Sequence, residues 1–145
     1  MDDLIIYYIN LDKDIERNSN MKNILDKLNI KYERIQGING SDINIKKKYK
    51  ILYNTPCLMS RGQYGCYLSH IKCYEKFIKS NYKYLIILED DAILNDNFKN
   101  SITNLFDNYN KLLKEKIDFI YLSRSNIIKE QYKVNIKYFN DDFIY

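Results

Sequence analysis

The chain has 145 residues, enough for one domain over residues 1–145, and its hydrophobic content of 46% excludes a disordered protein. A net charge of +4, from 23 basic and 19 acidic residues without a long basic stripe, argues against a nucleic-acid-binding protein. The chain has 3 cysteines, and this odd number at wide spacing argues against a disulfide framework. No leader peptide and no apolar stretch of membrane-spanning length is visible, so we expect a cytoplasmic protein without a transmembrane segment.

The first third of the chain is expected to alternate between strand and helix. The apolar, β-branched run over residues 4–9 is typical of a strand that is buried on both faces. A helix over residues 15–28, capped by Asp12 or Asp14, should follow, because its apolar positions lie on one helical face. A second strand is expected over residues 31–35.

The middle of the chain repeats this alternation. Ser60 and Gln63 form a capping-box pattern, which predicts a helix over residues 61–79. The apolar run over residues 84–88 is the strongest strand signal, and it ends directly in three acidic residues. Further elements are expected in chain order: a helix over residues 98–114 and strands over residues 118–123 and 134–139.

Alternating strands and helices predict an α/β fold with a mostly parallel sheet covered by helices on both faces. In such sheets ligands bind beyond the carboxyl ends of the strands. The loops that follow residues 9 and 88 are therefore the first places to look for a site.

The acidic triplet Glu89, Asp90 and Asp91 is the most informative feature of the sequence. Three adjacent carboxylates repel one another unless a cation lies among them, and a hard divalent ion that keeps positions open for phosphates would relieve the repulsion. In an extended strand Glu89 and Asp91 point one way and Asp90 the other. We expect Asp91 to bind the metal directly, Glu89 to bind the metal, its water or a ribose, and Asp90 to brace the loop. The alternative is a solvated acidic turn or the N-cap of the next helix.

Two other clusters allow a functional or a structural interpretation. The loop of Asn10, Leu11 and Asp12 after the first strand could reach a base or a ribose, and Arg17 could reach a diphosphate, although Arg17 alone suits the surface of a capped helix. Cys66, His70 and Cys73 share one helical face and, with Cys57, could form a zinc site. We expect core packing rather than zinc, because three ligands on one helix rarely close a tetrahedron.

Four segments together resemble glycosyltransferase family 25, which contains bacterial lipopolysaccharide galactosyltransferases and procollagen galactosyltransferases. These segments are residues 8–11 with Glu16 and Arg17, residues 38–40, residues 65–70 and residues 85–92. They follow the order and the approximate spacing of the family, and they cover about residues 4–125.

The resemblance implies a GT-A-like, Rossmann-type fold and the inverting transfer of galactose or glucose from a UDP-sugar to a hydroxyl of a glycan or a hydroxylated protein. It implies Mn²⁺, or Mg²⁺, held by Glu89 and Asp91 to stabilise the charge on the departing UDP. The residues expected to contact the donor or its metal are Asn10, Arg17, Ser69, His70, Glu89 and Asp90. Catalytic roles are expected for Asp91 and for Asp142, which with Asp141 offers the late acids that could act as the base.

Members of the family run well beyond this length, so we expect a fold truncated on the C-terminal acceptor side. The alternative function is therefore a non-catalytic, sugar-nucleotide-binding remnant, and an exposed edge would favour self-association. A nucleotidyltransferase is disfavoured because no glycine-rich loop follows Ile9, and an aspartyl phosphatase because Asn10 stands where its nucleophile belongs.

Overall fold

The structure is a computed structural model that describes residues 2–42, 60–107, 120 and 122. The chain divides into two compact units, which meet between Leu94 and Asn95 in the sequence. Among the described residues, the first unit contains a sheet of three strands and two helices, and the second contains one helix. That residues 1–145 make a single domain remains a prediction.

A parallel sheet forms the centre of the first unit. Strand β1 (Leu4–Asn10) lies between β2 (Tyr32–Gln36) and β3 (Tyr84–Glu89), and both neighbours run parallel to it. In register, Ile9 lies opposite Ile35 on one side and Glu89 on the other. The carboxyl ends of all three strands therefore reach the same edge of the sheet, and the predicted α/β fold, consistent with a Rossmann-like GT-A type, is confirmed.

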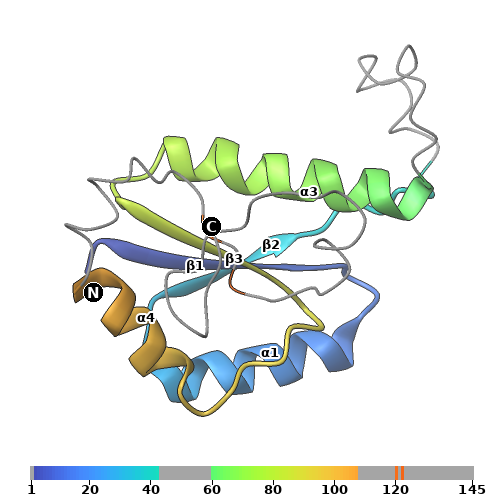
Figure 1. The fold of residues 1–145 in the computed structure, drawn as a ribbon. Coiled ribbons are helices and arrows are strands. Elements are labelled where there is room, and N and C mark those ends of the chain that lie inside the picture. Colours follow the sequence, from blue (N-terminus) through green and yellow to red (C-terminus); the bar gives the residue numbers. More distant parts are fainter. Residues whose placement is uncertain (1, 43–59, 108–119, 121, 123–145) are drawn as a thin grey trace, which may run out of the picture. The chain divides into compact units, whose positions relative to one another are not determined.

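Two helices cover the two faces of this sheet. Helix α1 (Ile15–Leu28) lies against one face and helix α3 (Arg61–Ile78) against the other (Figure 1). Side chains of β1 alternate between them: Tyr7 packs in a core with Cys73 of α3, whereas the Tyr8 hydroxyl donates to Asn18 Oδ1 of α1 at 2.8 Å. Every residue of β1 is buried, as expected for a central strand covered on both faces.

The core between the sheet and α3 is apolar and includes one cysteine. Cys73 is fully buried there, and burial raises the pKa of its thiol to about 11, so it is an inert packing residue. This confirms the expected packing role of Cys73. The cluster comprises Ile5, Tyr7, Ile9, Ile35 and Cys73, with Phe77, Tyr82, Leu85 and Ile87 packed against it.

The predicted side-chain cap is present at the start of α3 but not at the start of α1. The capping box of α3 is confirmed: Ser60 Oγ accepts from the Gln63 amide at 3.2 Å, and Gln63 Oε1 accepts from the Ser60 amide at 2.8 Å. Asp14 is the N-cap of α1, but its carboxylate makes no capping hydrogen bond. Its backbone carbonyl instead accepts from the Asn18 amide and from the Asn10 side chain.

Helix α4 (Phe98–Asp107) is the described element of the second unit. Its buried residues, Phe98, Ile102 and Leu105, lie on one helical face. The predicted continuation over residues 108–114 and the predicted strand over 134–139 lie outside the described residues. Within 118–123 the structure describes Ile120 and Leu122, neither of them in a strand. Among the residues described, no helix is long and apolar enough to cross a membrane.

Candidate functional site

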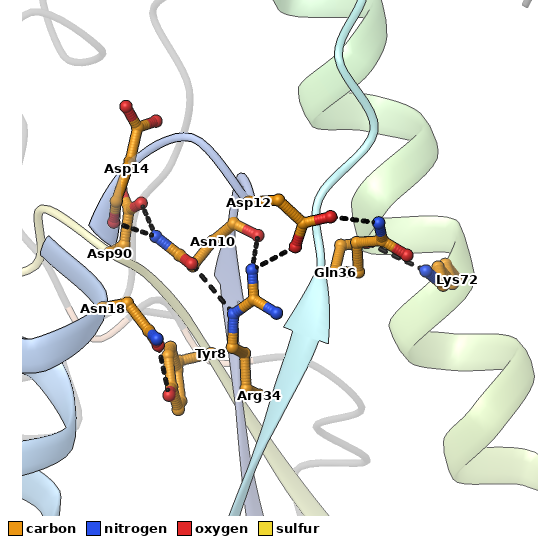
Figure 2. Close-up of polar contacts among 9 residues, drawn as sticks. All are labelled: Tyr8, Asn10, Asp12, Asp14, Asn18, Arg34, Gln36, Lys72 and Asp90. Carbon is orange, nitrogen blue, oxygen red and sulfur yellow. Dashed lines mark hydrogen bonds and ion pairs between the residues drawn. The ribbon is translucent and has the colours of Figure 1, made fainter.

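Asn10 joins the loops that follow β1 and β3. It is the last residue of β1 and only 2% exposed. Its side-chain amide donates to Asp90 Oδ2 at 2.7 Å and to the Asp14 carbonyl at 3.0 Å, and its Oδ1 accepts from Arg34 Nε at 2.8 Å (Figure 2). One buried side chain thus satisfies three partners from three segments, which fixes both loops at the carboxyl edge of the sheet.

Arg34 of β2 extends this network to Asp12. Its Nη2 donates to Asp12 Oδ1 at 2.6 Å and to the Asn10 carbonyl at 3.3 Å, and Gln36 donates to the other oxygen of Asp12 (Figure 2). These hydrogen bonds, first from Arg34 and then from Gln36, hold the pKa of Asp12 below its ordinary value. Asp12 therefore stays ionised, and the loop after β1 has a fixed carboxylate at its tip.

Arg17 contacts the acidic triplet from helix α1. Its Nη1 donates to Asp90 Oδ1 at 3.2 Å and lies 3.8 Å from Asp91 Oδ2. The Asp90 side chain is only 10% exposed, and it also accepts from Asn10. Because its carboxylate already binds the Arg17 guanidinium and the Asn10 amide, Asp90 is engaged within the protein, which fits its expected role of bracing the loop.

The expected alternation along the triplet holds for Glu89 and Asp90 but not for Asp91. Glu89 faces α3 and Asp90 faces α1. Strand β3 ends at Glu89, and the Ala92 amide donates to the Glu89 carbonyl at 3.0 Å, so a turn starts there. The turn brings Asp91 to the Arg17 side, with Asp90, rather than to the side of Glu89. The metal-binding roles of Glu89 and Asp91 remain predictions.

On the α3 side, Glu89 meets two side chains one helical turn apart. Its Oε1 lies 3.4 Å from Cys66 Sγ, which donates to it, and 3.4 Å from His70 Nε2. Burial, followed by the Glu89 carboxylate, raises the pKa of the Cys66 thiol, so this cysteine is a protonated thiol at neutral pH. His70, expected near the donor, is therefore placed beside the first acid of the triplet.

Gly65 and Ser69 attach the loop after β2 to α3. A Cβ at Gly65 would come within 2.4 Å of the Ile38 carbonyl oxygen, so only glycine permits this approach. Ser69 Oγ accepts from the Ile38 amide at 2.8 Å and donates to the Gly65 carbonyl at 2.7 Å. The buried Ser69 hydroxyl thus anchors the loop, and its expected contact with a donor remains a prediction.

That loop forms one wall of a pocket of about 420 Å³ at the carboxyl ends of β1 and β2. Its lining residues are Leu11, Asp12, Lys13, Gln36, Gly37, Ile38, Asn39, Asp42 and Lys72. Lys72 reaches it from α3, where its Nζ donates to the Gln36 carbonyl at 2.9 Å (Figure 2). The wall offers carboxylates, amides and ammonium groups, a set able to bind a polar ligand that carries negative charge.

The structure brings most of the predicted residues to one edge. Asp90 accepts hydrogen bonds from both Asn10 and Arg17, and His70 lies beside Glu89. Asp141 and Asp142 lie outside the described residues. Sequence reasoning placed Asp12 in a candidate loop without giving it a role, and it missed Arg34, Gln36 and Lys72. A signal existed for Arg34, since a charged residue inside a predicted strand of a covered sheet requires a partner.

The chain is similar to proteins of one family along nearly its whole length. Residues 3–142 match the family described as glycosyltransferase family 25 (LPS biosynthesis protein). A glycosyltransferase 25 family member of Aedes aegypti is 28% identical over 88% of this chain and 22% of its own length. Procollagen galactosyltransferase 2 of Homo sapiens is 25% identical over 88% of this chain and 22% of its own length. Inactive glycosyltransferase 25 family member 3 of Mus musculus is 24% identical over 87% of this chain and 23% of its own length.

The chain therefore spans less than a quarter of the length of these curated relatives. The family match nevertheless covers almost every residue, including the loops that form the site. As the sequence resemblance predicted, the chain belongs to glycosyltransferase family 25.

Proposed function

We propose that this chain binds a UDP-sugar at the carboxyl edge of its sheet and that the protein transfers the hexose, galactose or glucose, to a hydroxyl of a glycan or a protein. The observation that carries the proposal is the hydrogen bond from Asn10 to Asp90, which fixes the acidic triplet next to the polar pocket. A protein that binds a nucleotide-sugar through a metal ion needs its nucleotide subsite next to its metal subsite. The contact between Asn10 and Asp90 supports such an arrangement. Family membership and the human relative, named a galactosyltransferase, support the choice of sugar.

The nucleoside half of the donor suits the pocket between the loops after β1 and β2. Its volume of about 420 Å³ lies within the range of small-molecule sites. Asp12 is held ionised and oriented by Arg34, so it can accept from a ribose hydroxyl or a base N–H without reorganising. Lys72 and Lys13 bring positive charge that would attract a diphosphate.

In this proposal the carboxylates of Glu89 and Asp91, which lie on opposite sides of the turn, would each contribute an oxygen to a hard divalent ion such as Mn²⁺ or Mg²⁺. They are 53% and 65% exposed, whereas Asp90 is engaged by Asn10 and Arg17. Exposed carboxylate oxygens are the ligands such ions prefer when substrate phosphates complete the coordination. A bound ion would supply positive charge beside the oxygens of the departing UDP.

The protein's own groups position this chemistry. Arg17 and Asn10 keep Asp90 in place, so the backbone of the triplet is fixed before a donor arrives. An inverting transfer also requires a base within hydrogen-bonding reach of the acceptor hydroxyl. Asp142 is the predicted base and remains a prediction, because it lies outside the described residues.

A non-catalytic donor-binding protein is the second candidate. The observation that favours it is the mouse relative that is named inactive, which matches this chain over the same region. Both candidates predict donor binding, and only the first predicts turnover. A UDP-release assay with UDP-galactose and UDP-glucose, with and without sugar and hydroxylysine acceptors, separates them: acceptor-dependent release supports a transferase, and binding without release supports the alternative.

Donor binding itself is tested by thermal unfolding with UDP, in Mn²⁺ and in excess chelator. At one hundred times its dissociation constant a ligand stabilises by about 2.7 kcal/mol, which should raise the melting temperature of a chain of this size by several degrees. Asp91→Ala should abolish the part of the shift that requires Mn²⁺, and the charge-matched surface variant Glu75→Ala on α3 should retain it. An unchanged Mn²⁺-dependent shift in Asp91→Ala would refute the metal assignment.

A further inference from the structure

A second set of potential metal ligands lies on the opposite side of β3 from Asp90 and Arg17. Cys66, His70 and Glu89 each present one ligand atom, and the three atoms lie within 4.8 Å of one another. A thiol, an imidazole and a carboxylate are ligands for Zn²⁺ and similar borderline-soft ions, rather than for the hard ions that bind phosphates.

The distances in this set suit a tetrahedral ion. With Zn–S near 2.3 Å and Zn–N or Zn–O near 2.0 Å, a tetrahedral site separates its ligand atoms by about 3.3 to 3.5 Å. Glu89 Oε1 lies 3.4 Å from Cys66 Sγ and 3.4 Å from His70 Nε2. The Cys66 sulfur and the His70 nitrogen lie within 4.8 Å of each other.

The ligands come from two elements that the fold already holds together. Cys66 and His70 stand four residues apart on α3, one turn above the other, and Glu89 ends β3. The argument against zinc from the sequence required that all ligands come from one helix. That condition is not met, because the strand supplies the third ligand and Cys73 is buried in the core instead.

We propose that Cys66, His70 and Glu89 bind Zn²⁺, or another borderline-soft divalent ion, through three protein ligands with the fourth position open. The open side follows from exposure, since the His70 and Glu89 side chains are 29% and 53% exposed. Three protein ligands with one free position are typical of zinc sites that admit water or a substrate.

Binding the ion changes the protonation of the cluster. In the metal-free protein the Cys66 S–H donates to Glu89. A zinc ligand must be the thiolate, so the thiol proton leaves to solvent as the S–Zn bond forms, and affinity should rise with pH.

This site shares Glu89 with the donor metal site, which gives it a regulatory consequence that rests on the proposed function. A zinc ion would hold Glu89 on the α3 side, away from Asp91, so Zn²⁺ should weaken Mn²⁺-dependent UDP binding. Zn²⁺ binding itself requires neither UDP nor Asp91, which keeps the two proposals separable.

The test uses Co²⁺ as a spectroscopic substitute for Zn²⁺ on the full, reduced chain. A thiolate ligand produces a sulfur-to-cobalt charge-transfer band in the near ultraviolet, and one equivalent of Zn²⁺ should abolish it. Cys66→Ser and His70→Gln should lose the band and the stoichiometric Zn²⁺ binding measured against a chromophoric chelator. Asp91→Asn should keep both, while losing Mn²⁺-dependent UDP binding.

Circular dichroism of each variant shows whether it is folded. The cobalt spectrum of the wild-type chain tests the proposal even if a variant fails to fold. Absence of the cobalt band in the folded wild-type chain overturns the proposal. Undiminished Zn²⁺ binding in folded Cys66→Ser also overturns it, since the ion would then lie elsewhere. Zn²⁺ binding that persists while Asp91→Asn leaves UDP binding intact supports the zinc site and refutes the donor metal assignment alone.

Discussion

Replacing Asn10 by alanine should destabilise the protein more than any other single loss of a polar side chain at this edge. The side chain is 2% exposed and makes three hydrogen bonds, two of them to the charged groups Asp90 and Arg34. Bonds to charged groups contribute about 1.5 to 3 kcal/mol each and a neutral one about 1 kcal/mol. Because Asp90 and Arg34 retain some access to water, we expect a loss of about 2 to 4 kcal/mol rather than the full sum.

Urea unfolding of wild-type protein and Asn10→Ala measures this loss, provided that the dependence on urea is the same in both. The matched control is Asn18→Ala, which removes the acceptor of one hydrogen bond, from the Tyr8 hydroxyl, and should cost about 1 kcal/mol. A double-mutant cycle with Arg34→Met should show a coupling of about 0.5 to 3 kcal/mol. If Asn10→Ala costs no more than Asn18→Ala, the network does not fix the two loops as described.

Three further outcomes can be measured. Gly65→Ala should lower the free energy of unfolding by about 1 to 3 kcal/mol, because its Cβ would meet the Ile38 carbonyl; a neutral effect in urea contradicts the close approach. Ser60→Ala should cost about 1 kcal/mol in the same assay, since the capping box is lost. A hydrogen bond to the Asp26 carboxylate, with burial, raises the pKa of Tyr32 from 10.0 to about 12. The folded state keeps this proton longer than the unfolded state, so stability should fall as pH rises between about 10 and 12, and Tyr32→Phe should flatten that fall.

Most elements of the first unit could be predicted because their signals are local. A continuous apolar run identifies β1, the box of Ser60 and Gln63 starts α3, and the helical period of apolar residues gives α1. The contact between Asn10 and Asp90 could also be predicted from the sequence. Two strands joined by helical crossovers are parallel, so their carboxyl ends meet at one edge.

The remaining features depend on register and on turns, which local patterns do not determine. Arg34 reaches Asn10 only because β2 pairs with β1 so that Arg34 lies opposite Tyr8. Asp91 joins Arg17 because the strand ends at Glu89, whereas a strand one residue longer would send it to the other side. The cluster at Glu89 likewise requires that α3 cross β3 at the level of Cys66.

The position of bound Mn²⁺ on the sheet is the quantity on which the proposed function depends most directly. Paramagnetic broadening of backbone amide NMR signals measures it, because broadening falls with the inverse sixth power of the distance from the ion. With UDP present, a trace of Mn²⁺ should broaden the amides of Leu11 and Asp91. Those of Lys31 and Lys83, at the amino ends of β2 and β3, should stay sharp, since a strand of this length spans about 20 Å. Broadening centred on the amino ends, or unchanged in Asp91→Ala, would contradict a donor metal site at the carboxyl edge.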